Sequence, residues 1–301
     1  MNFKIGVDGG GTKTDCILVD GGGAIVARHL APGCNPSIVG PEQARLIMTD
    51  ALCTLLEESK IENPKSKISA THFYVAGATG FWREFAASLA DFGRTVAGPD
   101  SLPVLELATD GAPGLVLHAG TGSFVAARGP DGAVHYAGGI GWRFGDPGSG
   151  YELGRRAIGR ALLELQGWQP PTRLATLVRD HTQLGEGADA AAVTRFFYQH
   201  GEPNRTIAAL APAVLRLAAE GDSVALALVL ESANELLALA VQVATKLFPA
   251  TPLETLRVGL SGALLTHPVV ARALTPRAPF PLAPITEAPI EGVRRLLARN
   301  G

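Results

Sequence analysis

Three consecutive glycines lie between residues that could bind a phosphate and a metal ion. The segment Val7–Thr14 has the sequence V-D-G-G-G-T-K-T. Glycine backbone N–H groups can converge on one concavity, and the hydroxyls of Thr12 and Thr14 add donors, which favours binding of a phosphate oxyanion. Asp8 would repel a phosphate unless a divalent cation lay between them, so it predicts Mg²⁺ held through water. The alternative is a hairpin turn that only requires positive φ at glycine.

A second segment of the same kind begins at His118. Residues His118–Ser123 have the sequence H-A-G-T-G-S, in which two glycines flank Thr121. Backbone N–H and hydroxyl groups again offer donors to an oxyanion. Two such loops, one in each half of the chain, could face each other across a cleft and hold the two ends of a polyphosphate. The alternative is two glycine turns without a ligand.

Two aspartates also lie where they could contact a ligand. Asp146 lies in G-D-P-G-S-G-Y, before a predicted helix, and could accept hydrogen bonds from a ligand. Asp100 ends a short β-type run, the position at which α/β folds place ligand-handling groups. Each could instead be a helix N-cap.

A fifth segment, V-G-L-S-G-A-L, carries a strand, a turn of small residues and a helix start. A flat ring could lie against bare backbone at Gly262 and Ala263. A tight β-to-α turn without a ligand is the alternative.

The elements that must position these residues occur twice. Strand-like runs joined by glycine turns predict an antiparallel meander over 3–8, 15–19 and 24–30. The same pattern restarts about 110 residues later, over 114–119, 124–128 and 134–137. Helical periodicity follows each meander, first over 41–59 and then over much of 151–248. We therefore expect two related α/β lobes, over 1–113 and 114–286, and a C-terminal helix within 287–301 that packs back on the first lobe.

Composition narrows the class of protein. The 301 residues are 47% hydrophobic and carry a formal net charge of −2, which disfavours disorder and nucleic-acid binding. Three cysteines without a C-x-x-C spacing predict reduced thiols. Glu231, Asn234 and Glu235 interrupt the most apolar region, so we expect no membrane span. Asp8 and three glycines stand where a secretory peptide would keep its apolar run, so we expect no export signal and a cytoplasmic location.

Together these segments resemble a known family. Asp8–Thr14, Gly120–Ser123, Gly145–Gly150 and Gly259–Gly262, in this order, resemble the N-acetylglucosamine kinase and BadF-BadG-BcrA-BcrD-type ATPase family. It belongs to the superfamily of sugar kinases, actin and heat-shock chaperone ATPases. The resemblance implies an α/β fold of two ribonuclease-H-like lobes, each with a mixed sheet and helices, and a nucleotide cleft between the lobes.

The resemblance also implies roles for individual residues. Asp8 matches the Mg²⁺-associated carboxylate and Asp100 the catalytic base. The residues that would bind ATP lie in two phosphate loops and an adenosine-contacting turn: Gly9, Gly10, Gly11, Thr12, Lys13, Gly120, Thr121, Gly122, Gly262 and Ala263. Those that would bind the sugar are Asn35, Asp100, Thr121 and Asp146. The family usually has a glutamate where this chain has Pro147, so an acid role at that position is lost.

The expected function is transfer of a phosphoryl group from ATP to the 6-hydroxyl of N-acetylglucosamine, the reaction of an ATP:N-acetylglucosamine 6-phosphotransferase. The family resemblance also favours a homodimer. Kinases of glucosamine or another hexosamine are an alternative, as are an ATPase that activates a dehydratase and a sugar-sensing regulator. The latter two classes need a shared iron–sulfur cluster and a DNA-binding segment respectively. Neither the placement of Cys16, Cys34 and Cys53 nor a first strand starting at Phe3 favours them.

Overall fold

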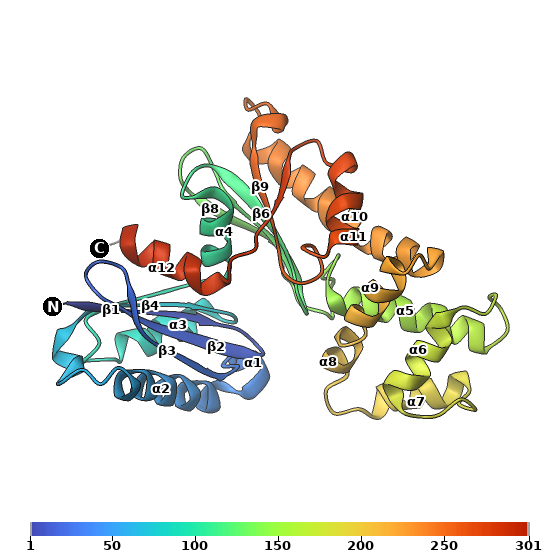
Figure 1. The fold of residues 1–301 in the computed structure, drawn as a ribbon, viewed down its shortest axis with the longest axis horizontal. Coiled ribbons are helices and arrows are strands. Elements are labelled where there is room, and N and C mark those ends of the chain that lie inside the picture. The colour runs from blue at the N-terminus through green and yellow to red at the C-terminus, as the bar shows by residue number, and fades with distance from the viewer. Residues whose placement is uncertain (1, 300–301) are drawn as a thin grey trace. The chain divides into compact units, whose positions relative to one another are not determined.

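The computed structural model describes residues 2–299, which divide into two compact lobes. Residues 2–110 and 287–299 form the first lobe, and residues 111–286 form the second. Each lobe has its own five-stranded sheet and its own buried core (Figure 1).

The first lobe is built on a mixed sheet in the order β3-β2-β1-β4-β5. β1 pairs antiparallel with β2, and β2 with β3, whereas β4 is parallel to both β1 and β5. The short glycine-containing connections make the meander, and the longer helical connections make the parallel pairs. The strands are β1 (Phe3–Gly9), β2 (Lys13–Val19), β3 (Ile25–Pro32), β4 (Ile68–Val75) and β5 (Arg94–Gly98).

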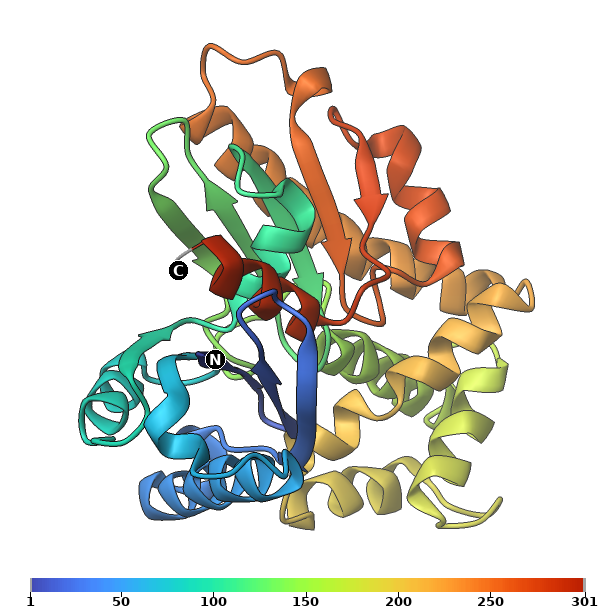
Figure 2. The same cartoon turned by 60° about the vertical axis from the view of Figure 1, so that its left-hand side comes forward.

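Helices cover both faces of this sheet. Met48, Leu52 and Leu55 of α2 (Pro41–Glu58) pack with apolar side chains of β1 and β4. On the other face, the C-terminal helix α12 (Pro289–Arg299) packs with Ile17 and Val19 of β2, and it also contacts β1 and α4 (Figure 2). The remaining helices are α1 (Pro36–Val39), η1 (Pro64–Lys67), α3 (Thr79–Ala87) and α4 (Ser101–Thr109).

The second lobe repeats the connectivity of the first. Its sheet has the order β10-β9-β6-β7-β8, with β6, β7 and β8 antiparallel and β9 and β10 parallel to β6. β6 and β7 therefore correspond to β1 and β2, which confirms the predicted pair of related α/β lobes. The strands are β6 (Gly114–Ala119), β7 (Ser123–Arg128), β8 (Val134–Gly138), β9 (Arg257–Ser261) and β10 (Leu282–Pro284).

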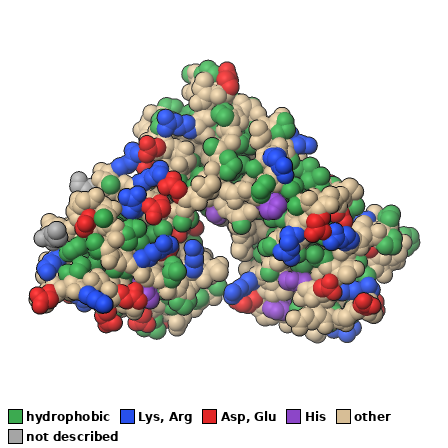
Figure 3. Space-filling model, in the orientation of Figure 1, with side chains coloured by type: hydrophobic (Ala, Val, Ile, Leu, Met, Phe, Trp, Pro, Cys, Tyr) green, Lys and Arg blue, Asp and Glu red, His purple; other side chains and the backbone are tan. Residues whose placement is uncertain are grey.

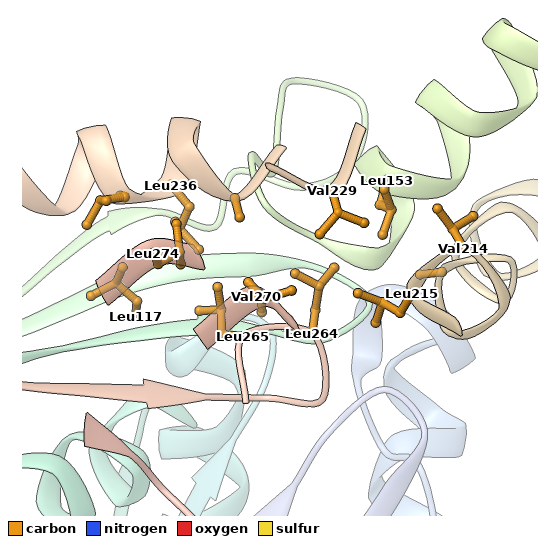
Figure 4. Close-up of a cluster of buried hydrophobic side chains, with 14 of the residues drawn as sticks. Leu117, Leu153, Val214, Leu215, Val229, Leu236, Leu264, Leu265, Val270 and Leu274 are labelled. Carbon is orange, nitrogen blue, oxygen red and sulfur yellow. The ribbon is translucent and has the colours of Figure 1, made fainter. Parts of the chain in front are cut away.

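The helices of the second lobe enclose an extensive apolar core. Figure 4 shows Val229 and Leu236 of α10 among the buried side chains of the core, with Leu117 of β6 and Leu264 in the same cluster. The helices are α5 (Gly150–Leu165), α6 (Arg173–Thr182), α7 (Ala190–Gln199), α8 (Pro203–Ala208), α9 (Ala211–Ala219), α10 (Ser223–Leu247), η2 (Leu253–Thr255), α11 (Pro268–Leu274) and η3 (Thr275–Arg277).

By length and composition, α10 is the one helix within residues 2–299 that could cross a membrane, although the sequence predicts no such segment. Its buried residues form a stripe that includes Val229, Leu236 and Ala240 and packs in the lobe core. On the exposed side, Glu231 and Glu235 pair with Arg156 of α5. In this structure α10 is thus arranged as an amphipathic core helix.

Several element boundaries differ from the sequence-based expectation. The helix expected after the Gly262 turn begins only at Pro268, because His267 caps it and proline suits a first helical position. The periodic region 206–219 divides into α8 and α9. The proline-rich segment 276–289 contains β10, a three-residue edge strand too short to show a periodic pattern.

Basic and acidic side chains are interspersed over the visible face of each lobe (Figure 3). This distribution agrees with the near balance of 26 basic and 28 acidic residues.

Candidate functional site

The first Gly-Thr turn connects the carboxyl end of β1, the central strand of its sheet, to β2. Gly10 N–H donates to the Lys13 carbonyl over 2.9 Å, which closes the turn. Two other segments hold it in place: Cys34 N–H donates to the Gly10 carbonyl, and Ala76 N–H to that of Gly9. Gly11, Thr12 and Lys13 are exposed. The backbone of the turn is therefore fixed by hydrogen bonds from two other segments, while its residues 11–13 remain accessible, as binding of a ligand requires.

Crowding explains two glycines of this turn, Gly9 and Gly11, better than backbone conformation does. None of the glycines at positions 9, 10 and 11 has positive φ. A Cβ added at Gly9 would lie 2.8 Å from Val75 Cγ1, and one at Gly11 would lie 2.8 Å from Ile38 Cδ1. A Cβ added at Gly33 would lie 2.3 Å from the Gly11 carbonyl oxygen. The alternative of a turn that only needs positive φ is therefore wrong for this segment.

Asp8 lies at the carboxyl end of β1, directly before this turn and opposite Asp15 in the β1–β2 ladder. Burial, and after it the negative charges of Asp100 and Asp15, raise the pKa of Asp8 to about 7, while Lys13 acts in the opposite direction. Arg28 pairs with Asp15 and limits its effect. Burial and the neighbouring carboxylates disfavour the charged form of Asp8, and a cation bound there would stabilise that form.

Asp100 lies between β5 and α4 without capping the helix. It occupies the N-cap position of α4, but its side chain makes no capping hydrogen bond. Burial raises the pKa of its carboxyl group, and the backbone N–H groups of Asp100 and Ser101 act in the opposite direction. Its charge acts on Asp8, so the first lobe brings the two carboxylates within electrostatic range. The N-cap alternative is not what the structure shows.

Asn35 does act as a helix cap. Its Oδ1 accepts a hydrogen bond of 3.0 Å from Ser37 N–H at the start of α1. A Cβ added at Gly77 would lie 2.7 Å from the same oxygen. Asn35 is therefore held against the segment after β4, and its amide –NH2 group is the part that could donate to a ligand.

The second Gly-Thr turn is joined to the Asp146 loop by three hydrogen bonds. Gly150 N–H donates to the Gly120 carbonyl over 2.8 Å, and Tyr151 N–H to the Thr121 carbonyl over 3.2 Å. Ser123 Oγ donates to the Pro147 carbonyl over 2.6 Å. Because this last bond uses only the backbone of residue 147, a proline there is compatible with the loop shape.

Asp146 is buried beside the turn. Its Oδ1 accepts from Gly141 N–H at 3.2 Å, and its Oδ2 would lie 2.9 Å from a Cβ added at Gly122. Burial raises the pKa of this carboxyl group, and the Gly141 N–H opposes that shift. Ser149 caps α5, so Asp146 is not the cap. The second lobe thus brings together Gly120, Thr121, Gly122 and Asp146.

Gly262 extends this cluster from β9. It has φ +85°, and an added Cβ would lie 2.2 Å from the Ala119 carbonyl oxygen. Only glycine can make this close approach, which places the turn containing Gly262 and Ala263 against the end of β6. The expected adenosine-contacting turn therefore adjoins the second Gly-Thr turn within one lobe.

The donor chemistry around Asp8 fits Mg²⁺. Magnesium prefers hard oxygen ligands and is commonly bound by one or two carboxylates together with substrate phosphates and waters. Residues 2–299 contain no group of three or more His, Cys, Asp or Glu side chains that could enclose a metal by themselves. A carboxyl group whose pKa is raised by burial and by the charges of Asp100 and Asp15 suits an ion that arrives with a polyphosphate.

Two pairs at the site were not expected from the sequence. Arg28 binds Asp15 beside Asp8, and His118 Nδ1 lies 3.1 Å from Ser261 Oγ at the base of the second turn. Ser261 lies 143 positions from His118, whereas Arg28 is on the strand that follows that of Asp15. In both pairs the strand register, which the sequence does not reveal, brings the side chains together.

Comparison with known proteins relates the whole arrangement to sugar kinases. An N-acetyl-D-glucosamine kinase of Dictyostelium discoideum is 27% identical over 244 residues, which cover 77% of this chain and 76% of the relative. An N-acetylmuramic acid/N-acetylglucosamine kinase of Clostridium acetobutylicum is 26% identical over 241 residues, or 78% of this chain and 77% of the relative. A solved structure of a candidate N-acetylglucosamine kinase from Chromobacterium violaceum is similar with a TM-score of 0.80 at 27% identity and covers 99% of both chains.

A family model matches residues 5–277, which include all or most of β1 to β9, both Gly-Thr turns and the two aspartates Asp100 and Asp146. The chain belongs to the BadF/BadG/BcrA/BcrD ATPase family.

Proposed function

We propose that this protein is an ATP-dependent amino-sugar kinase that phosphorylates the 6-hydroxyl of N-acetylglucosamine. Three similar proteins bear the name of an N-acetylglucosamine kinase. The observation that carries the proposal is the environment of Asp100, a carboxylate at a strand end that caps no helix and acts electrostatically on Asp8. A kinase needs such a group near its metal-associated carboxylate.

Asp100 is the proposed general base. The sugar 6-oxygen attacks the γ-phosphorus, the bond from that phosphorus to the bridging oxygen breaks, and ADP leaves. The hydroxyl proton passes to the Asp100 carboxylate. A base works best when its pKa lies near the working pH, and burial shifts the pKa of Asp100 upwards in that direction. Phosphoryl transfer depends mainly on positioning and charge stabilisation, so a single base of this kind is sufficient.

The two Gly-Thr turns are the proposed phosphate ligands. Gly9, Gly10, Gly11, Thr12 and Lys13 supply donors from the first lobe, and Gly120, Thr121 and Gly122 supply them from the second. Bound Mg²⁺, held through water by Asp8, would neutralise charge on the phosphates. Gly262 and Ala263 contact the adenosine.

The proposed sugar ligands come from both lobes as well. Asn35 donates through its amide –NH2, because its Oδ1 is occupied by Ser37 N–H. Asp146 accepts from a sugar hydroxyl, and Thr121 supplies a further hydroxyl contact. Asp146 is buried, and a buried polar group discriminates strongly against sugars that lack the matching hydroxyl.

A substrate panel tests this proposal. The purified protein is incubated with Mg-ATP and, separately, N-acetylglucosamine, glucosamine or glucose, and ADP release is followed. We expect the highest kcat/KM with N-acetylglucosamine and a product that carries phosphorus on the 6-oxygen by NMR. A higher kcat/KM with glucosamine would make glucosamine the assigned substrate in place of N-acetylglucosamine. The absence of sugar-dependent ADP release would refute the kinase assignment.

A further inference from the structure

One imidazole lies at the base of two turns in the second lobe. His118 is the partner of Ser261 in the parallel β6–β9 ladder, and its Nδ1 lies 3.1 Å from Ser261 Oγ. On the other side of the ring, Nε2 would lie 3.4 Å from a Cβ added at Gly120. The ring therefore faces the first residue of the second Gly-Thr turn while bonding to the last residue of β9.

Aromatic stacking fixes the plane of this ring. His118 stacks on Phe124 with centroids 4.8 Å apart and an interplanar angle of 17°. Phe124 in turn stacks on Tyr136 at 5.0 Å. Burial lowers the pKa of His118 to about 4, so the imidazole is neutral at pH 7 and makes an ordinary hydrogen bond to the serine hydroxyl.

The same two turns also touch through their backbones. The Ala119 carbonyl accepts a hydrogen bond of 3.3 Å from Leu264 N–H, and it faces Gly262 so closely that no side chain could fit there. His118 is thus the side chain that adds a hydrogen bond between β6 and β9 at the point where both strands become loops.

We propose that His118 and Ser261 are positioning residues that hold the Gly120–Gly122 turn in register with the Gly262–Ala263 turn, so that phosphate and adenosine contacts form on the same nucleotide. This inference rests on the proposed function only for the assignment of a nucleotide to these turns. Neither side chain needs to touch the ligand. Loss of their bond lets the two turns move separately, which weakens nucleotide binding before it affects the sugar site.

Four variants separate this role from general stability. His118→Phe keeps a flat ring for stacking but loses the bond to Ser261, and Ser261→Ala removes the bond from the other strand. His118→Asn places an amide group near the position of Nδ1 and can restore the bond. Thr255→Ala is the matched control, since it also removes one hydroxyl hydrogen bond, the 2.8 Å contact to the Pro252 carbonyl that precedes β9.

The readout is the Kd of Mg-ADP by calorimetry, which requires no sugar turnover. We expect His118→Phe and Ser261→Ala each to raise this Kd about two- to tenfold, the usual effect of one neutral hydrogen bond. The double variant should be no weaker than the single variants, and His118→Asn and Thr255→Ala should bind like the wild type. KM for the sugar should remain unchanged.

The failures of the two proposals are distinguishable. Unchanged Mg-ADP affinity in both His118→Phe and Ser261→Ala would overturn the positioning role, as would additive losses in the double variant. A wild-type protein that binds Mg-ADP but phosphorylates no amino sugar would overturn the proposed function and leave the positioning role to be judged on the binding data alone.

Discussion

Arg28 donates two hydrogen bonds to Asp15, of 2.9 Å from Nε to Oδ1 and 2.7 Å from Nη2 to Oδ2, on the strand directly beside Asp8. Asp15 is almost fully buried, whereas the Arg28 side chain is 45% exposed. The pair places a compensated carboxylate opposite the proposed metal-associated one. It therefore limits the negative charge in this part of the first lobe.

Removal of Arg28 should leave that buried carboxylate uncompensated. We expect Arg28→Ala to lower the free energy of unfolding by about 1–3 kcal/mol, with a smaller loss for Arg28→Lys because a lysine cannot make the two-point contact. Urea denaturation measures the effect, and Arg83→Ala, at an exposed position of α3, is the control. Equal stability of Arg28→Ala and the control would show that the pair contributes nothing.

Gly122 and Asp146 are coupled by direct crowding. Because a Cβ at residue 122 would lie 2.9 Å from Asp146 Oδ2, Gly122→Ala should displace this carboxylate. We expect KM for the sugar to rise by about tenfold, the value of one displaced hydrogen bond to a charged group. Gly159→Ala is the matched control, since an added Cβ meets nothing within 4 Å there. Loss of sugar affinity in the control, or its retention in Gly122→Ala, would contradict this coupling.

The C-terminal helix is fixed to the first lobe by a partly buried ion pair. Arg299 Nε lies 2.6 Å from Oε1 of Glu106, whose side chain is only 1% exposed, and Arg299 also binds Asp110. Arg299→Ala should therefore cost about 3 kcal/mol of stability, because Glu106 loses a charged partner in a buried position. Arg272→Ala, on the exposed surface of α11 in the second lobe, provides the comparison. If the first lobe of Arg299→Ala unfolds at the same urea concentration as that of the wild type, the ion pair does not stabilise the lobe.

His72 makes stability depend on pH in a defined window. Burial, then the positive charges of Arg94 and Lys4, lower its pKa to about 4, whereas an unfolded histidine titrates near 6.5. Between these values the unfolded chain binds more protons, so stability is complete above pH 6.5 and falls as the pH drops towards 4.

The size of this effect can be isolated by mutation. Going from pH 7 to pH 5, His72→Phe should lose about 2 kcal/mol less stability than the wild type. His135→Gln removes an exposed histidine and should follow the wild-type pH dependence. If His72→Phe and the wild type have the same pH dependence in urea denaturation, His72 titrates normally in the folded state.

The sequence predicts the repeated meander because glycine turns and β-type runs are local signals. It does not predict β10, since three residues between prolines carry no period. The run of Gly9, Gly10 and Gly11 predicts a ligand loop, but the crowding of Gly9 by Val75 and of Gly11 by Ile38 arises from long-range packing.

Side-chain contacts between strands that are distant in sequence likewise cannot be predicted from local sequence patterns. His118 and Ser261 lie 143 positions apart, and only the β6–β9 register makes them neighbours. For Asp100, the family resemblance implies a base and the position before a helix allows an N-cap, and the absence of a capping bond counts against the N-cap only.

The base assignment of Asp100 is tested most directly by sugar-dependent ADP release. Asp100→Asn keeps the size of the side chain but cannot accept the proton, so kcat should fall by about 10²–10⁴-fold while Mg-ADP binding is retained. Asp91→Asn, at an exposed carboxylate of the same lobe, should retain wild-type kcat. An Asp100→Asn protein that turns over N-acetylglucosamine at the rate of the Asp91→Asn control would contradict the account.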